Sequence, residues 1–200
     1  MIDQPFRDFL KDRVEPFLAL YRRYGLSPNA VTLLGLGFGL LSALTLGLGW
    51  NWIALWLWWV GRALDGTDGI YARSIGKATD FGGYLDIVAD MAAYSAMILG
   101  FAASRPQFIW WWLVILLLYV LCITSALALG SLERREGIGA EDNRSLKLAA
   151  GLAEGGETGI AYTLLLVLPG ATAWLCPLWS LILGVTVLAR TLVAKAELRR

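Results

Sequence analysis

The stretch DGTDGIYARSIGKATDFGGYLDIVAD, residues 65–90, decides how the rest of the chain is interpreted. It lies between strongly apolar segments, yet it holds five of the chain's 16 acidic residues. Asp65 and Asp68 are three residues apart, and Asp86 and Asp90 are four apart. Residues at these spacings share one face of a helix. The stretch therefore predicts a cluster of carboxylates projecting from two neighbouring helices, of the kind that binds metal ions for phosphoryl transfer.

Composition places the chain in a membrane. Hydrophobic residues make up 58% of its 200 residues and charged residues only 16%, whereas soluble domains carry about 25% charged residues. The ten tryptophans gather in segments such as WNWIALWLWWV and IWWWL, and aromatic rings are enriched where a membrane meets water. The composition predicts an all-α integral membrane protein.

The residue types present limit the possible chemistry. The chain has no histidine, which excludes Ser-His and Cys-His couples and the usual zinc sites. A general base must then be a carboxylate, Lys, Tyr or Cys. A metal must be bound through oxygen, which favours Mg²⁺, Mn²⁺ or Ca²⁺. Cys122 and Cys176 lie in or beside apolar runs without metal-ligand spacing, so we expect both to pack as small apolar side chains.

Six segments are apolar enough to cross a membrane as helices of about 20 residues. They cover residues 30–50, 51–73, 79–103, 107–131, 147–168 and 172–194. Residues 1–27 instead alternate charged and apolar residues and predict an amphipathic helix on the membrane surface. Ser27 is the expected N-cap of the first span, with Pro28 at its first position. The sequence thus predicts one domain over residues 1–200, in which six transmembrane helices over 28–200 follow the surface helix.

Basic residues occur in alternate connections between the predicted spans. They precede the first span, lie between the second and third, flank the long loop after the fourth and close the chain. The other connections carry only Arg105. Because Lys and Arg are enriched on the cytoplasmic side, we expect both termini and the acidic stretch to be cytoplasmic. The expected location is the cell (inner or plasma) membrane.

Carboxylates at membrane depth are costly unless they are paired, hydrated or bound to a cation. Asp90 would lie about 15 Å along a helix that begins near Thr79, from the rise of about 1.5 Å per residue. Clustered carboxylates also repel one another, and one or two divalent cations would offset that charge. Asp80 lies nearer the helix start, where a single Asp is usually a cap, so we leave it outside the cluster.

Small residues and one arginine surround the acidic positions. The glycines are Gly66, Gly69, Gly76, Gly82 and Gly83. Glycine allows close approach by a ligand or by another helix, and for Gly82 and Gly83 both interpretations stay open. Arg73 is equally suited to clamp a phosphate and to anchor its helix on the cytoplasmic side.

The spacing of eight residues resembles the signature of the CDP-alcohol phosphatidyltransferase family. The matching positions are Asp65, Asp68, Gly69, Ala72, Arg73, Gly82, Asp86 and Asp90. The six apolar segments agree with that family, and SPNAVTL at residues 27–33 resembles its short sequence before the first span. The resemblance covers the chain well as far as the third predicted span and only in outline beyond it.

The resemblance implies a phospholipid-synthesis enzyme that moves the phosphatidyl group of CDP-diacylglycerol, or of a related CDP-linked donor, to the hydroxyl of an alcohol and releases CMP. It implies two ions, Mg²⁺ or Mn²⁺, held by Asp65, Asp68, Asp86 and Asp90, with Asp90 also the general base. Contacts to the CDP donor are implied for Asn29, Thr32, Asp68, Gly69, Ala72, Arg73, Thr79 and Gly82. It further implies membrane lipids as neighbours, a homodimer and no nucleic-acid partner.

The acceptor side is less defined. The loop SLERREGIGAEDNRSLK, residues 131–147, offers Arg134, Arg135, Arg144 and Lys147 to an acceptor phosphate. The same loop carries four acidic residues, so a solvated loop with cytoplasmic basic residues is the alternative.

Glu154 and Glu157 are three residues apart and share a helix face. They are suited to bind the hydroxyls of an uncharged polyol or an ammonium group. The alternative is that they are partners of a basic residue, the candidates being Arg62, Arg73 and Lys147.

A second functional class is a small cation- or proton-coupled transporter that uses the intramembrane carboxylates. Against it, the carboxylates gather near one side of the predicted membrane, and no matching charges continue to the other side.

Overall fold

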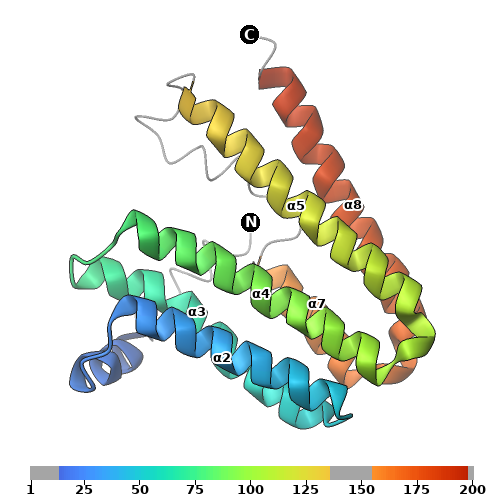
Figure 1. Ribbon diagram of the computed structural model, residues 1–200, viewed down its shortest axis with the longest axis horizontal. Coiled ribbons are helices and arrows are strands. Elements are labelled where there is room, and N and C mark those ends of the chain that lie inside the picture. The colour runs from blue at the N-terminus through green and yellow to red at the C-terminus, as the bar shows by residue number, and fades with distance from the viewer. Residues whose placement is uncertain (1–13, 136–154, 198–200) are drawn as a thin grey trace. The chain divides into compact units, whose positions relative to one another are not determined.

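The computed structural model describes residues 14–135 and 155–197, and every element within these ranges is helical (Figure 1). The all-α class predicted from the sequence is confirmed. The long helices are α2 (Pro28–Gly47), α3 (Asn51–Ser74), α4 (Asp80–Ser104), α5 (Ile109–Arg135), α7 (Gly155–Val167) and α8 (Thr172–Glu197). Two 3₁₀ turns, η1 (Pro106–Phe108) and η2 (Pro169–Ala171), precede α5 and α8. Side chains are described as far as Ser131 in α5 and Ala196 in α8.

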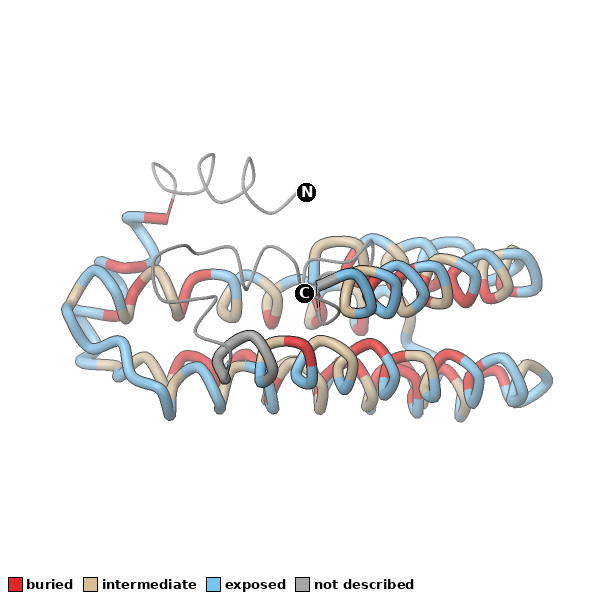
Figure 2. The backbone as a smooth tube through the Cα atoms, turned by 90° about the horizontal axis from the view of Figure 1, so that it is seen from above, coloured by how far each residue is buried: buried red, intermediate tan, exposed pale blue. Residues whose placement is uncertain are grey.

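The helices form two compact units, Ile2–Gln107 and Phe108–Arg200, and each is described by itself. In both, buried residues recur in short stretches between exposed ones (Figure 2). This pattern is typical of helices that bury one stripe and expose the other. The single-domain organisation stays a prediction.

Within residues 14–135 and 155–197, four helices are long and apolar enough to cross a membrane, which makes the chain a multi-pass membrane protein. They are Pro28–Gly47, Asp80–Ser104, Pro106–Ser131 and Pro169–Ala196. Helix α3 is as long, but it carries Arg62, Asp65, Asp68 and Arg73. Helix α7 has 13 residues, and residues 147–154 of the fifth predicted span lie outside the described ranges. The count of six spans therefore stays a prediction.

In the first unit, α2 packs against both α3 and α4, whereas α3 and α4 touch each other little. Glycines make these contacts close. A Cβ on Gly61 of α3 would lie 3.0 Å from the carbonyl oxygen of Gly35 in α2. A Cβ on Gly100 of α4 would lie 2.5 Å from the carbonyl oxygen of Ala43. Small residues at such crossings let helix backbones approach in a membrane, so the glycines let both α3 and α4 pack closely on α2.

We expect Gly100→Ala to destabilise the first unit, because the added methyl would meet the backbone oxygen of Ala43. Overpacking of this kind costs about 1–3 kcal/mol. The matched control is Gly37→Ala, since a Cβ on Gly37 meets nothing within 4 Å and alanine favours a helix by up to about 1 kcal/mol. Thermal unfolding in detergent should lower the Tm of Gly100→Ala and leave that of Gly37→Ala unchanged or higher. Equal Tm values for the two variants would contradict the close contact.

Within the first unit, the chain before α2 is helical over residues 14–23 and packs against α2 and α3. Val14, Leu18 and Tyr21 are buried and contact Val31 and Tyr71. The Tyr21 hydroxyl lies 2.8 Å from the Thr67 hydroxyl, and burial raises the pKa of Tyr21 above its ordinary value. The apolar side of residues 14–23 therefore packs on protein, and the membrane-surface helix predicted for residues 1–27 stays a prediction. Residues 1–13 of the predicted surface helix lie outside the described ranges.

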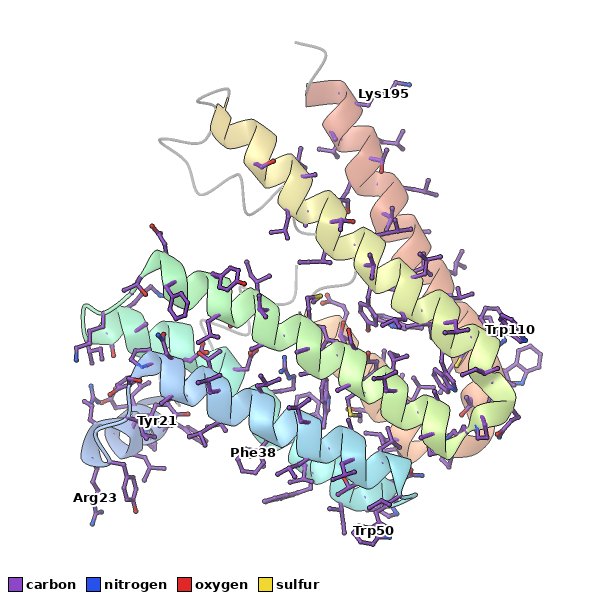
Figure 3. The ribbon with its side chains drawn as sticks, viewed as in Figure 1. Tyr21, Arg23, Phe38, Trp50, Trp110 and Lys195 are labelled. Atoms are coloured by element: carbon purple, nitrogen blue, oxygen red, sulfur yellow. The ribbon has the colours of Figure 1, made fainter. Side chains whose placement is uncertain are left out.

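The segment before α2 and the start of α2 differ in how well they agree with the predictions. Phe17, expected on the apolar side, is 45% exposed. Ser27 is the N-cap of α2 and accepts a hydrogen bond from the Ala30 amide at 3.2 Å, with Pro28 in the first turn, as predicted. In Figure 3, Arg23 points away from the helices.

In the second unit, α5 and α8 lie side by side (Figure 1). The Tyr119 hydroxyl of α5 accepts a hydrogen bond from Trp179 of α8 at 3.1 Å and lies 3.4 Å from the Thr158 hydroxyl of α7. The predicted packing of both cysteines is confirmed, since Cys122 and Cys176 are buried and neither is in a disulfide.

Exposed tryptophans mark helix starts in both units. Trp50 precedes α3 and is 55% exposed, and Trp110 is 78% exposed at the start of α5. Figure 3 shows both rings projecting outward. Tryptophan at such ends is typical of a membrane interface.

Candidate active site

The acidic stretch folds into the facing sides of α3 and α4. Asp65 and Asp68 lie on α3 and Asp86 lies on α4, and one carboxylate oxygen from each lies within 4.8 Å of the others. We call these three residues the acid cluster. Asp68 is 5% exposed and accepts a hydrogen bond from the Thr32 hydroxyl of α2. Three of the four carboxylates predicted from the sequence thus converge, and α2 supplies a hydrogen-bond donor to the most buried of them.

The donor set of the acid cluster fits a hard divalent cation. Three carboxylates supply oxygen ligands only, which Mg²⁺ and Mn²⁺ prefer. Three like charges at this separation would otherwise repel one another. A bound cation is therefore the simplest way for the charged forms to coexist.

Asp90 lies one turn beyond Asp86 on α4 and is held by an arginine. Arg62 Nη1 of α3 donates to Asp90 Oδ1 at 2.5 Å and to Asp65 Oδ2 at 3.2 Å. The side chains of Arg62, Asp65 and Asp90 are 9%, 18% and 26% exposed. Arg62 therefore links the acid cluster to Asp90.

A cleft of about 190 Å³ opens beside the acid cluster, and we call it the polar cleft after the polar and charged side chains among its lining residues. All eight residues that the family resemblance assigns to the CDP donor line it: Asn29, Thr32, Asp68, Gly69, Ala72, Arg73, Thr79 and Gly82. Five further lining residues did not stand out as donor contacts in the sequence: Pro28, Lys77, Ala78, Gly83 and Asp86. The start of α2, the end of α3 and the start of α4 together make the cleft.

The start of α4 corrects one expectation. Thr79, not Asp80, is the N-cap: its hydroxyl accepts a hydrogen bond from the Gly82 amide at 3.0 Å. Asp80 is instead the first helical residue and is exposed, where a negative charge still stabilises the helix dipole. A threonine preceding the acid provides the short hydroxyl that the cap position requires.

Glycines bring the walls of the polar cleft together. A Cβ on Gly82 would lie 3.3 Å from the Thr79 hydroxyl and 3.5 Å from Asn29 Oδ1. A Cβ on Gly69 would lie 3.4 Å from Arg73 Nη1, so the guanidinium folds over Gly69 along the cleft wall. Arg73 and Lys77 therefore both bring positive charge to the lining of this cleft.

The acceptor-side candidates are only partly described. The side chains of Arg134 and Arg135 and the residues Arg144 and Glu154 lie outside the described part of the chain. Glu157 lies in the first turn of α7, in the second unit. It borders a cavity of about 320 Å³ whose other lining residues are apolar, apart from the indole nitrogen of Trp179.

Arg62, a candidate partner of Glu154 and Glu157 in the sequence analysis, has a place beside the acid cluster that its spacing indicates. Arg62 precedes Asp65 by three residues, which places both on one helix face.

Comparison with known proteins agrees with this geometry. The family model described as CDP-alcohol phosphatidyltransferase matches residues 26–186. The chain belongs to this family. It is therefore a CDP-alcohol phosphatidyltransferase, a metal-dependent membrane enzyme of phospholipid synthesis that transfers a phosphatidyl group from a CDP-linked donor to an alcohol.

Individual relatives cover most of the chain. The inner membrane protein YnjF of Escherichia coli is 29% identical over 196 residues, which are 95% of this chain and 93% of the relative. The phosphatidylinositol phosphate synthase of Mycobacteroides abscessus is 29% identical over 160 residues, which are 78% of this chain and 66% of the relative.

Solved structures share the fold. The crystal structure of Mycobacterium tuberculosis phosphatidylinositol phosphate synthase with CDP-DAG bound aligns with a TM-score of 0.66 at 22% identity, over 90% of this chain and 92% of that one. The same enzyme in complex with manganese and citrate aligns with a TM-score of 0.64 at 23% identity, over 90% of this chain and 87% of that one.

Proposed function

We propose that the chain transfers the phosphatidyl group of CDP-diacylglycerol to the hydroxyl of an alcohol and releases CMP at the acid cluster. One observation carries this proposal: the eight residues assigned to the donor line a single cleft, and that cleft includes Asp68 and Asp86 of the acid cluster. A donor diphosphate bound in this cleft would have the phosphorus–oxygen bond that breaks next to these carboxylates.

Different residues of the polar cleft would bind different parts of the CDP donor. Arg73 and Lys77 supply positive charge for the diphosphate. Gly69 and Gly82 add no side chain of their own to the walls, which leaves room for the nucleotide beside Arg73 and Thr79. Asn29 and Thr32 border the cleft from the start of α2.

Two ions, Mg²⁺ or Mn²⁺, would be held by Asp65, Asp68, Asp86 and Asp90. The ions would offset negative charge on the diphosphate and on the departing CMP. Asp90 would accept the proton of the acceptor hydroxyl, since a neutral alcohol needs a base within hydrogen-bond reach. The alcohol oxygen then bonds to the phosphorus that carries the diacylglycerol. The bond from that phosphorus to the bridging oxygen breaks, and CMP leaves with the oxygen.

The acceptor is proposed by class only. Arg134, Arg135 and Arg144 would suit an acceptor that carries a phosphate, whereas Glu154 and Glu157 would suit an uncharged polyol or an ammonium group. A screen with labelled CDP-diacylglycerol decides between them, with polyols, amino alcohols, glycerol phosphate and phosphatidylglycerol as acceptors and product mass as the readout. A product formed only with uncharged or amino alcohols would favour the glutamates, and one formed only with phosphorylated acceptors would favour the arginines.

Orientation and assembly complete the proposal. The basic connections favour a cytoplasmic active site and cytoplasmic termini in the cell membrane, and family resemblance favours a homodimer. The transporter alternative has no comparable support, because the family to which the chain belongs is one of transferases.

We expect Arg73→Gln to weaken donor binding without removing the chemistry. Hydrogen bonds to charged groups contribute about 1.5–3 kcal/mol, so the KM for CDP-diacylglycerol should rise roughly 10- to 100-fold while kcat changes less. Arg23→Gln is the matched control, because Arg23 is exposed and points away from the helices. Steady-state CMP release at varied donor concentration measures both. A KM unchanged in Arg73→Gln would contradict the phosphate-binding role.

A further inference from the structure

Arg62 is a nearly buried arginine that belongs neither to the acid cluster nor to the lining of the polar cleft. It lies one turn before Asp65 on α3. The rings of Trp58 and Tyr94 lie against its guanidinium, with ring centroids 4.9 and 5.0 Å from Cζ. Aromatic faces attract a cation, and two of them limit how far the guanidinium can move. Arg62 is therefore a fixed cation beside the site.

One nitrogen of Arg62 joins α3 to α4. Nη1 donates to Asp65 Oδ2 at 3.2 Å on its own helix and to Asp90 Oδ1 at 2.5 Å on α4. It also donates to the Tyr94 hydroxyl at 3.1 Å. Because Asp90 and Tyr94 are four residues apart, they share one face of α4. Arg62 thus holds that face at two successive turns.

The packing of the first unit makes such a link necessary. Helices α3 and α4 pack mainly on α2 and touch each other little. The separation between a carboxylate on α3 and one on α4 is therefore set by side chains that reach across as well as by the helix contacts to α2. Arg62 supplies one such connection, at the level of Asp65 and Asp90.

The contacts are also selective among the carboxylate oxygens. Nη1 contacts Oδ2 of Asp65 and Oδ1 of Asp90. The other oxygen of each carboxylate lies outside these contacts and is left for a cation or, at Asp90, for the acceptor hydroxyl. If Arg62 only neutralised negative charge, it would not need to contact one particular oxygen of each carboxylate.

We propose that Arg62 is a positioning residue, which fixes the carboxylate of Asp90 relative to Asp65 so that Asp90 can take the proton of the acceptor alcohol. This inference rests on the function proposed above, because it assigns Arg62 to the same reaction. A base displaced by about 1 Å can cost on the order of 100-fold in rate. The effect of losing Arg62 should therefore appear in the chemical step.

The test compares Arg62→Gln and Arg62→Lys with wild type. In Arg62→Gln, kcat for CMP release should fall between about 10- and 100-fold, while the KM for CDP-diacylglycerol changes less than about threefold. Arg62→Lys keeps the charge and a donor for Asp90, so it should recover part of the lost kcat. Arg22→Gln is the control, because Arg22 is exposed and its ion pair among the described residues is with exposed Glu15.

Mn²⁺ binding to the purified protein without substrate gives a second readout, measured by electron paramagnetic resonance. Arg62→Gln keeps Asp65, Asp68 and Asp86, and the loss of a nearby positive charge does not oppose a cation. Its Mn²⁺ affinity should therefore be retained while kcat falls.

Two results would overturn the role of Arg62. One is wild-type kcat in Arg62→Gln. The other is loss of Mn²⁺ binding together with lowered thermal stability, which would make Arg62 a structural residue. Wild-type protein that released no CMP with any acceptor would instead refute the proposed function itself.

Discussion

Replacing Asp90 by asparagine is expected to lower CMP release by about 1,000-fold or more at saturating donor. Asparagine keeps the shape of the side chain and an oxygen that can accept from Arg62 Nη1, so the helices should stay in place. It cannot take the proton of the acceptor hydroxyl, and it is a weaker ligand for a hard cation. The loss should therefore fall on kcat. Purified variant and wild type are compared for CMP release over a range of donor concentrations.

Asp80→Asn provides the matched control for this experiment. It makes the same chemical change on the same helix, but Asp80 is exposed in the first turn and lines no part of the polar cleft. Its activity should equal that of wild type. An Asp90→Asn protein that kept more than about a tenth of wild-type kcat would be inconsistent with a general base, since such groups contribute at least about 100-fold.

The second large effect is expected for Asp68→Asn, and it concerns metal binding. Asp68 is the most buried member of the acid cluster, and it also lines the polar cleft. Its loss as a ligand should weaken Mn²⁺ binding by more than about 100-fold, since even residues that only support a ligand commonly contribute 10- to 100-fold. Activity at a fixed, limiting Mn²⁺ concentration should fall in parallel.

Calorimetric titration with Mn²⁺ measures this directly. Asparagine can still accept from the Thr32 hydroxyl, so the contact between α2 and α3 is expected to survive and the Tm to change little. The Asp80→Asn protein again serves as the control for removal of one negative charge. Mn²⁺ binding of wild-type strength in Asp68→Asn would rule out Asp68 as a ligand.

Much of the first unit could be predicted from local sequence. Residues close in the chain determine the N-cap of α2 at Ser27 and Pro28 and the length of the apolar helices α2 and α4. They also determine that Asp65 and Asp68 share a helix face. Helical spacing alone placed each pair of carboxylates on one face. The closeness of the two pairs in one short stretch predicted that the two faces meet, in agreement with the family signature, and the structure brings three of the four carboxylates within 4.8 Å of one another.

Other features could not be read from the sequence. The bridge from Arg62 to Asp90 spans 28 residues and two helices, and no local spacing encodes such a contact. The burial of Tyr21 against Tyr71 likewise depends on how a segment before the first span folds back onto α3. The cap at Thr79 was missed because an acidic residue beside it satisfies the same sequence preference.

The acceptor side shows a different difficulty. Arg134, Arg135, Arg144, Glu154 and Glu157 lie within or just after a loop where both signs of charge alternate. The sequence of this loop therefore predicts neither a basic nor an acidic pocket. A carboxylate and a guanidinium recognise different alcohols, so residue type alone leaves the acceptor class open, and the product-mass screen answers it.

The central claim is that this chain cleaves CDP-diacylglycerol at a metal-bound acid cluster and transfers the phosphatidyl group to an alcohol. The most direct measurement follows CMP and lipid product together, with purified protein, CDP-diacylglycerol, the acceptor panel and Mg²⁺ or Mn²⁺. We predict equal amounts of CMP and phosphatidyl alcohol with at least one acceptor, and neither after chelation of the metal. Absence of CMP with every acceptor and both metals, in protein that retains its fold and binds Mn²⁺, would contradict the claim.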